Sequence, residues 1–150
     1  MRKPKSYRVS STHSGNSQPP TGQSETLFTD GPAFELEVDA TSRRRVDYKG
    51  YLGRGFDAWV RAGLAALRLV ADSGTVAPKT IINYAGSGWP RWLDFLIASK
   101  GPADPKHMRP EHINGFVAWL TRRYPSRTSA HTNYAHVKPM LIAICNLGLG

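Results

Sequence analysis

Apolar residues recur with a helical period through the last two thirds of the chain. From about Tyr51 onward they are spaced three and four residues apart, which is the pattern of amphipathic helices. The pattern predicts four helices: one from residue 51 to about 72, one within 77–101, one within 108–124 and one from about 126 to 146. Their connections are short and no strand pattern separates them, so residues 51–150 are expected to form an all-α four-helix bundle.

The apolar side of each predicted helix supplies a candidate core. Cys145, the only cysteine, falls in the apolar run of the fourth helix and is expected to be a small core residue in a reducing compartment. The expected core positions are Leu52, Phe56, Trp59, Val60, Gly63, Leu67, Val70, Ile81, Tyr84, Ala85, Gly88, Trp92, Phe95, Leu96, Ile113, Phe116, Val117, Leu120, Tyr124, Tyr134, Val137, Leu141 and Ile144.

The first 50 residues lack this period. Ser, Thr, Gly, Gln and Pro crowd residues 10–24, so ordering them costs about 1 to 2 kcal/mol of backbone entropy per residue with little burial in return. We therefore expect a disordered tail and linker over residues 1–50. The alternating segment FELEV, residues 34–38, is compatible with a short strand but has no evident partner, and residues 42–50 are interpreted as a basic linker.

The second predicted helix carries Gly-Ser-Gly-Trp-Pro at its middle. Pro90 lacks the N–H that would bond to the carbonyl of Gly86, so a local bend is expected between Tyr84 and Trp92. Two interpretations of the bend stay open. It either fits the helix to DNA or makes room in the core for Trp89 and Trp92.

Charge narrows the class of partner. The net charge is +9 at pH 7, and residues 51–150 hold twelve basic and five acidic side chains, a net charge of +7. Such an excess favours a polyanion, because Lys and Arg gain free energy by releasing counterions from phosphate backbones. Nucleic acid is the first candidate and an anionic membrane surface the second. No segment has the ~18 to 20 apolar residues of a membrane-spanning helix or the apolar core of a signal peptide, so we expect a cytoplasmic protein without a membrane partner.

The sequence offers no catalytic constellation. The five histidines stand in no H-E-x-x-H motif and no C-x-x-C occurs, so a metal site is not expected. A phosphate-binding glycine loop and the G-x-S-x-G motif are also missing. We expect no catalysis, no metal and no cofactor.

Two polar helix faces carry groups suited to DNA. On the second helix four side chains follow one another at steps of four residues, and Thr80 lies in the first turn, where free backbone N–H groups favour a phosphate. An ordinary solvated helix face explains either set alone, whereas two such faces in a domain of charge +7 favour DNA. The candidate DNA-binding residues are Lys79, Thr80, Asn83, Ser87 and Arg91 on the second helix and Arg127, Thr128, His131, Asn133 and Lys138 on the fourth.

Three segments also carry a family resemblance. In PKTIINYAGSGWPRWLDFL, Thr80 precedes Tyr84 by four positions and the run ends in Phe95 and Leu96. This spacing resembles the segment that opens the core-binding domain of tyrosine recombinases of the phage-integrase type. MRPEHINGFVAWL and SRTSAHTNYAHVKPMLIAICNLGL resemble the third and fourth elements of that domain, so the resemblance covers residues 51–150.

The resemblance implies a SAM-like domain that closes over double-stranded DNA in site-specific recombination or integration, together with other recombinase protomers on the DNA. It also implies a separate catalytic domain with a Tyr nucleophile and an H-x-x-R pair, and no H-x-x-R occurs in this chain. We therefore expect a non-catalytic, DNA-clamping part of a recombinase, either a fragment or a truncated gene product. The alternative is a small helical protein–protein interaction module that offers a basic surface to an acidic partner and an apolar end, MLIAICNLGLG, for docking.

Overall fold

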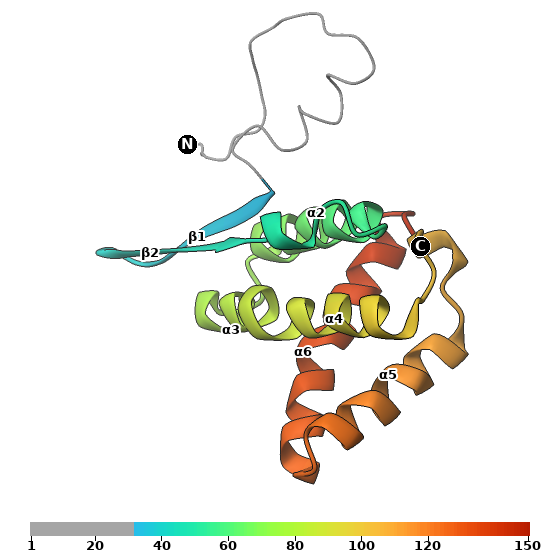
Figure 1. The fold of residues 1–150 in the computed structure, drawn as a ribbon. Coiled ribbons are helices and arrows are strands. Elements are labelled where there is room, and N and C mark those ends of the chain that lie inside the picture. The colour runs from blue at the N-terminus through green and yellow to red at the C-terminus, as the bar shows by residue number, and fades with distance from the viewer. Residues whose placement is uncertain (1–31) are drawn as a thin grey trace, which may run out of the picture.

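The computed structural model describes residues 32–150, which are mostly helical and begin with a two-stranded ribbon (Figure 1). The disorder expected for residues 1–31 lies outside the described residues. In the described part no helix is long and apolar enough to cross a membrane. The elements are β1 (Ala33–Asp39), β2 (Ser42–Asp47), the 3-10 turn η2 (Lys49–Tyr51), α2 (Asp57–Ser73), α3 (Pro78–Asn83), the π-helical turn η3 (Tyr84–Gly88), α4 (Trp89–Ser99), the 3-10 turn η4 (Pro105–His107), α5 (Pro110–Arg123) and α6 (Arg127–Asn146).

The ribbon corrects the prediction of a tail and linker for residues 32–50, and it adds a strand pair to the expected all-α fold. β1 and β2 pair antiparallel, with Phe34 opposite Val46 and Leu36 opposite Arg44. The inner face, which carries Phe34 and Val46, packs on the helices, and Phe34 is buried. Because side chains alternate along a strand, Glu35 and Glu37 of β1 lie on the other face, where Glu35 pairs with arginines of β2.

The expected bend in the second helix is a π-helical turn, η3, between α3 and α4. In this turn the N–H of Trp89 donates to the carbonyl of Tyr84, five residues back. Pro90 has no N–H to repeat that bond to Ala85, and its ring would clash with the carbonyl four residues earlier in a regular α-helix. The hydroxyl of Tyr48 donates to the Ala85 carbonyl instead, at 2.5 Å. The end of the ribbon therefore satisfies a backbone group that Pro90 leaves without a helical partner.

Replacing Tyr48 by phenylalanine is expected to lower the free energy of unfolding by about 1 to 3 kcal/mol, because the buried Ala85 carbonyl would lose its hydrogen bond. Urea denaturation measures the change. Tyr51→Phe is the matched control, since the Tyr51 hydroxyl bonds to Asp94 in a half-exposed place where water can replace it. Equal stability of Tyr48→Phe and the wild type would contradict the role given to this hydroxyl.

The core is an aromatic cluster joined by two close helix contacts. Trp59, Trp89 and Trp92 are fully buried, which is compatible with the interpretation that the bend makes room for tryptophans in the core. Gly63 of α2 faces the Trp89 ring, where an added Cβ would lie 2.0 Å from the indole nitrogen. Gly88 faces α6, where an added Cβ would lie 2.7 to 2.9 Å from atoms of His136. Both contacts need the absence of a side chain.

Three details of the predicted helices are wrong. The first helix begins at Asp57 and not near Tyr51, because Gly53 and Gly55 before it have φ of 77° and 94°, outside the helical region. Cys145 is exposed, so it is no core residue. Val117 is also exposed, at 39%, although it falls on the apolar side of the predicted helix. α5 and α6 otherwise start and end close to the predicted bounds.

Candidate nucleic-acid interface

The polar ridge predicted along the second helix is divided by the π-helical turn. Lys79 and Asn83 are exposed and lie on α3, before the turn. Ser87, within the turn, and Arg91, after it, are half-buried. A π-helical turn holds an additional residue, so positions four apart no longer stack one above another across it. The ridge is therefore not continuous, and only its α3 part faces solvent.

Arg91 is engaged by the protein itself. Its Nη1 donates to the carbonyl of Ser87 at 2.9 Å, and its guanidinium lies over the ring of Tyr124, 5.1 Å from the centroid. A cation on an aromatic face is attracted by the ring electrons. Arg91 thus joins α4 to the end of α5 and does not stand on an exposed polar ridge as the sequence predicts; its contact with DNA stays a prediction.

Thr80 does not offer the free backbone donor that a phosphate would need. It is half-buried, and its N–H donates to the carbonyl of Ala77 at 3.0 Å. The expected phosphate contact in the first turn of this helix is therefore not supported by the hydrogen bonding.

His136 lies where α6 crosses the π-helical turn. Its ring is 6.0 Å from that of Tyr84, and Gly88 approaches its backbone. Burial, and then the positive charge of Arg91, lower the pKa of His136 below its ordinary value. The imidazole is therefore neutral at neutral pH and adds no charge to the surface.

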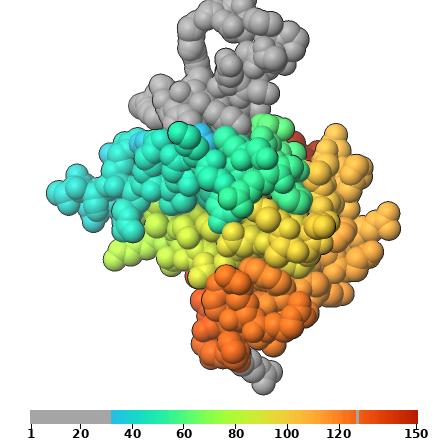
Figure 2. Space-filling model, viewed as in Figure 1, coloured from blue at the N-terminus to red at the C-terminus, as the bar shows by residue number. Residues whose placement is uncertain are grey.

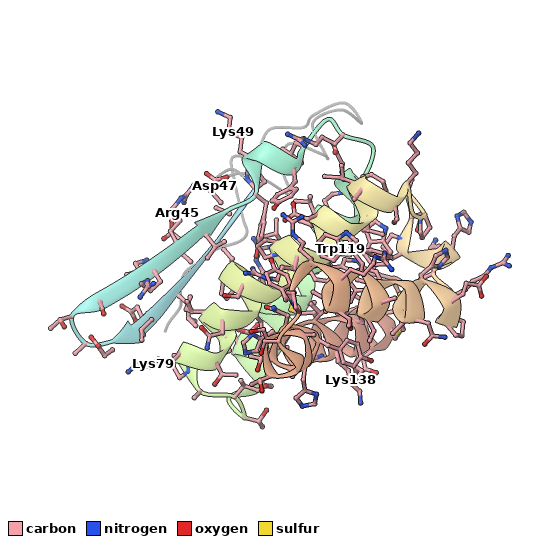
Figure 3. The ribbon with its side chains drawn as sticks, turned by 60° about the horizontal axis from the view of Figure 1, so that its bottom comes forward. Arg45, Asp47, Lys49, Lys79, Trp119 and Lys138 are labelled. Atoms are coloured by element: carbon pink, nitrogen blue, oxygen red, sulfur yellow. The ribbon has the colours of Figure 1, made fainter. Side chains whose placement is uncertain are left out.

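The outer side of α6 keeps its predicted polar residues at the surface. Thr128, His131 and Lys138 are exposed, and Asn133 is half-buried. His131 and Lys138 are seven residues apart, about two helical turns, so they lie on the same side. Arg127 is the first residue of α6. In Figure 3, Lys138 and Lys79 both lie along the lower edge of the view, on different helices.

Two further cations, Arg122 and Arg123, were missed by the sequence reasoning. Both are exposed in the last turn of α5, and the guanidinium of Arg123 lies 5.3 Å from the centroid of the Trp119 ring. Basic residues in a last helical turn are ordinary partners of the helix dipole, so their position alone does not signal a ligand. The turn from α5 to α6, drawn in orange, protrudes below α4 in Figure 2. This corner thus presents cations at the surface.

The ribbon has a different electrostatic character. Residues 32–50 hold four basic and four acidic side chains, so they contribute no net charge. Hydrogen bonds from Arg43 and Arg45 lower the pKa of Glu35, which stays ionised between them. The excess charge of the described residues therefore belongs to residues 51–150, the helices and their connections.

Known proteins give no guide to this surface: no family model, no curated protein and no solved structure matches the chain. Within residues 32–150 no group of three or more His, Cys, Asp or Glu side chains is placed to hold a metal ion. The candidate interface consists of exposed cations and polar side chains on α3, the end of α5 and α6.

Proposed function

We propose that this protein binds double-stranded DNA through α6 and the end of α5, with α3 beside them. The observation that carries the proposal is the absence of acidic residues from residues 112–150, which hold Arg122, Arg123, Arg127 and Lys138. We call residues 112–150 the acid-free segment. It comprises nearly all of α5 and the whole of α6, and the one carboxylate on these two helices, Glu111, lies in the first turn of α5, at the other end of that helix from Arg122 and Arg123.

Repulsion among these cations destabilises the free protein, and binding to a polyanion removes that repulsion. Like charges repel one another, and exposed ion pairs with acids would have reduced that repulsion. A duplex phosphate backbone neutralises the cations and releases its own condensed counterions, which favours binding at moderate salt. The charge pattern therefore fits a partner with regularly spaced phosphates.

The biological setting follows from the resemblance to tyrosine recombinases. We propose that the domain clamps DNA during site-specific recombination or integration, next to other recombinase protomers, and that it does not itself cut DNA. The cutting and rejoining of strands would belong to residues outside this chain. A cytoplasmic location is part of this proposal.

Lys138→Ala and Lys79→Ala are each expected to weaken duplex DNA binding about tenfold at ~0.1 M salt, since each removes about one phosphate contact. Both side chains are exposed, so the fold should persist. Arg54→Ala removes the same charge from the exposed turn before α2 and serves as the control. Fluorescence anisotropy with a labelled duplex measures all three. An equal loss in Arg54→Ala would show that attraction is spread over the whole surface.

A protein-interaction module is the second candidate, and exposed apolar residues near the end of α6 favour it. Ile142, Leu147 and Leu149 are 50%, 39% and 37% exposed. Most other large apolar side chains of this segment, including Met140 and Ile144, are buried in the core. The apolar surface for docking is therefore smaller than the sequence suggests. Apolar docking would persist at high salt, whereas DNA binding would not.

A further inference from the structure

The three consecutive arginines of β2 do not share one environment. The carboxylate of Glu35 lies between Arg43 and Arg45, 2.9 Å from Nε of the first and 2.5 Å from Nη1 of the second. Arg45 also lies 3.7 Å from a carboxylate oxygen of Asp47. The outer face of the ribbon is thus a ladder of paired charges, which has little attraction left for a phosphate.

Arg44 lies on the opposite face of the ribbon. It stands across from Leu36, and alternation along the strand puts it on the same side as Val46, which packs against the core. Arg44 is exposed, and its side chain makes no hydrogen bond or ion pair with any residue in 32–150. One of the three arginines therefore carries a charge that no carboxylate of residues 32–150 neutralises.

The inner face of the ribbon lies beside α3. β1 runs next to α3 in Figures 1 and 3, and Lys79 lies on that side of the ribbon in Figure 3. A Cβ added at Gly86, just past α3, would lie 3.9 Å from Cγ2 of Val46, so the inner face also reaches the π-helical turn. Lys79 and Asn83 are exposed on α3. The ribbon–α3 edge is our name for Arg44, Lys79 and Asn83.

We propose that the ribbon–α3 edge is a second contact with the DNA backbone, in which Arg44 and Lys79 bind phosphates and Asn83 donates a hydrogen bond beside them. The inference rests on the proposed DNA binding and assigns part of it to a strand that the sequence suggests is a linker. A guanidinium matches a phosphate through two parallel hydrogen bonds, and Arg44 is free to make them. The ribbon then acts as an arm alongside the α6 surface.

The two neighbouring arginines provide a matched test. In the full chain, Arg44→Ala is expected to weaken duplex DNA binding about tenfold at ~0.1 M salt and to lower the slope of log K against log[salt] by about one. Arg43→Ala removes the same charge one residue away, and it is expected to change affinity less than twofold because Glu35 already neutralises Arg43. Arg44→Gln keeps most of the side-chain stem, so it separates lost charge from lost packing against Leu36.

Each result has a distinct meaning. Equal weakening by Arg44→Ala and Arg43→Ala would overturn the inference in favour of diffuse attraction. An Arg44→Ala protein that binds like the wild type, while Lys138→Ala is weakened, would refute the ribbon contact and leave the α6 surface standing. Failure of the wild type to bind duplex DNA would remove both proposals.

Discussion

Replacing Gly88 by alanine is expected to lower the free energy of unfolding by at least about 2 kcal/mol, although alanine is the better helix former by about 1 kcal/mol. The added Cβ would lie 2.8 Å from the carbonyl oxygen of His136 and 2.9 Å from its carbonyl carbon. These are backbone atoms of α6, so no side-chain rotation relieves the contact. The variant must push α6 away from the π-helical turn and open the core that both share.

Gly86 supplies the control, because it lies in the same turn and faces open space apart from Val46 at 3.9 Å. Gly86→Ala is expected to leave stability unchanged or to raise it by up to about 1 kcal/mol. Urea denaturation of the two variants and the wild type compares them directly. If Gly88→Ala proves as stable as Gly86→Ala, the close approach of α6 to this turn is wrong.

The triple variant Arg122→Ala, Arg123→Ala, Lys138→Ala is expected to bind duplex DNA on the order of a thousandfold more weakly than the wild type at ~0.1 M salt. Each cation that neutralises a phosphate contributes about tenfold at this salt concentration through counterion release. All three side chains are exposed. The loss should therefore come from the interface and not from the fold, which circular dichroism checks.

A second triple variant with the same change in net charge tests whether position matters. Arg43, Arg54 and Lys106 are also exposed, but they lie on the ribbon, before α2 and in η4, which precedes the first residue of α5, whereas Arg122 and Arg123 lie in the last turn of α5. Their replacement by alanine is expected to weaken binding less than tenfold. Comparable losses in the two triple variants would refute a localised interface.

The helices were predictable because apolar spacing records which side faces the core. α5 illustrates this, since Phe116 and Leu120 at i and i+4 are both fully buried. Apolar spacing is a less reliable guide to burial at the end of a helix and at the edge of its apolar side. Cys145 and Val117 lie beside the apolar stripe and are exposed.

The ribbon was not predictable from its second strand. β2 reads Ser-Arg-Arg-Arg-Val-Asp, and only Val46 in it is apolar, so the alternation of buried and exposed positions is hidden. The ribbon is held in place by contacts between residues distant in the sequence. The main one is the hydrogen bond that the Tyr48 hydroxyl donates to the Ala85 carbonyl. Glu35 of β1, eight residues before Arg43, was the available clue to a paired strand.

Half of the candidate interface could be predicted from the sequence. Lys79, His131 and Lys138 lie at the surface as expected. Arg91 does not, because an exposed ridge at steps of four assumes a regular α-helix, and Pro90 imposes a different turn. No spacing rule predicts that a guanidinium will cover an aromatic ring from another helix.

The salt dependence of duplex DNA binding by the full chain tests the central claim most directly. From about 50 to 200 mM salt, log K is expected to fall linearly with log[salt], with a slope between about −3.5 and −5.5 for four to six phosphate contacts. In the triple variant of Arg122, Arg123 and Lys138 the slope should be shallower by about three. A wild-type slope near zero, or no measurable binding to a duplex at 50 mM salt, would contradict the proposal that this surface binds DNA.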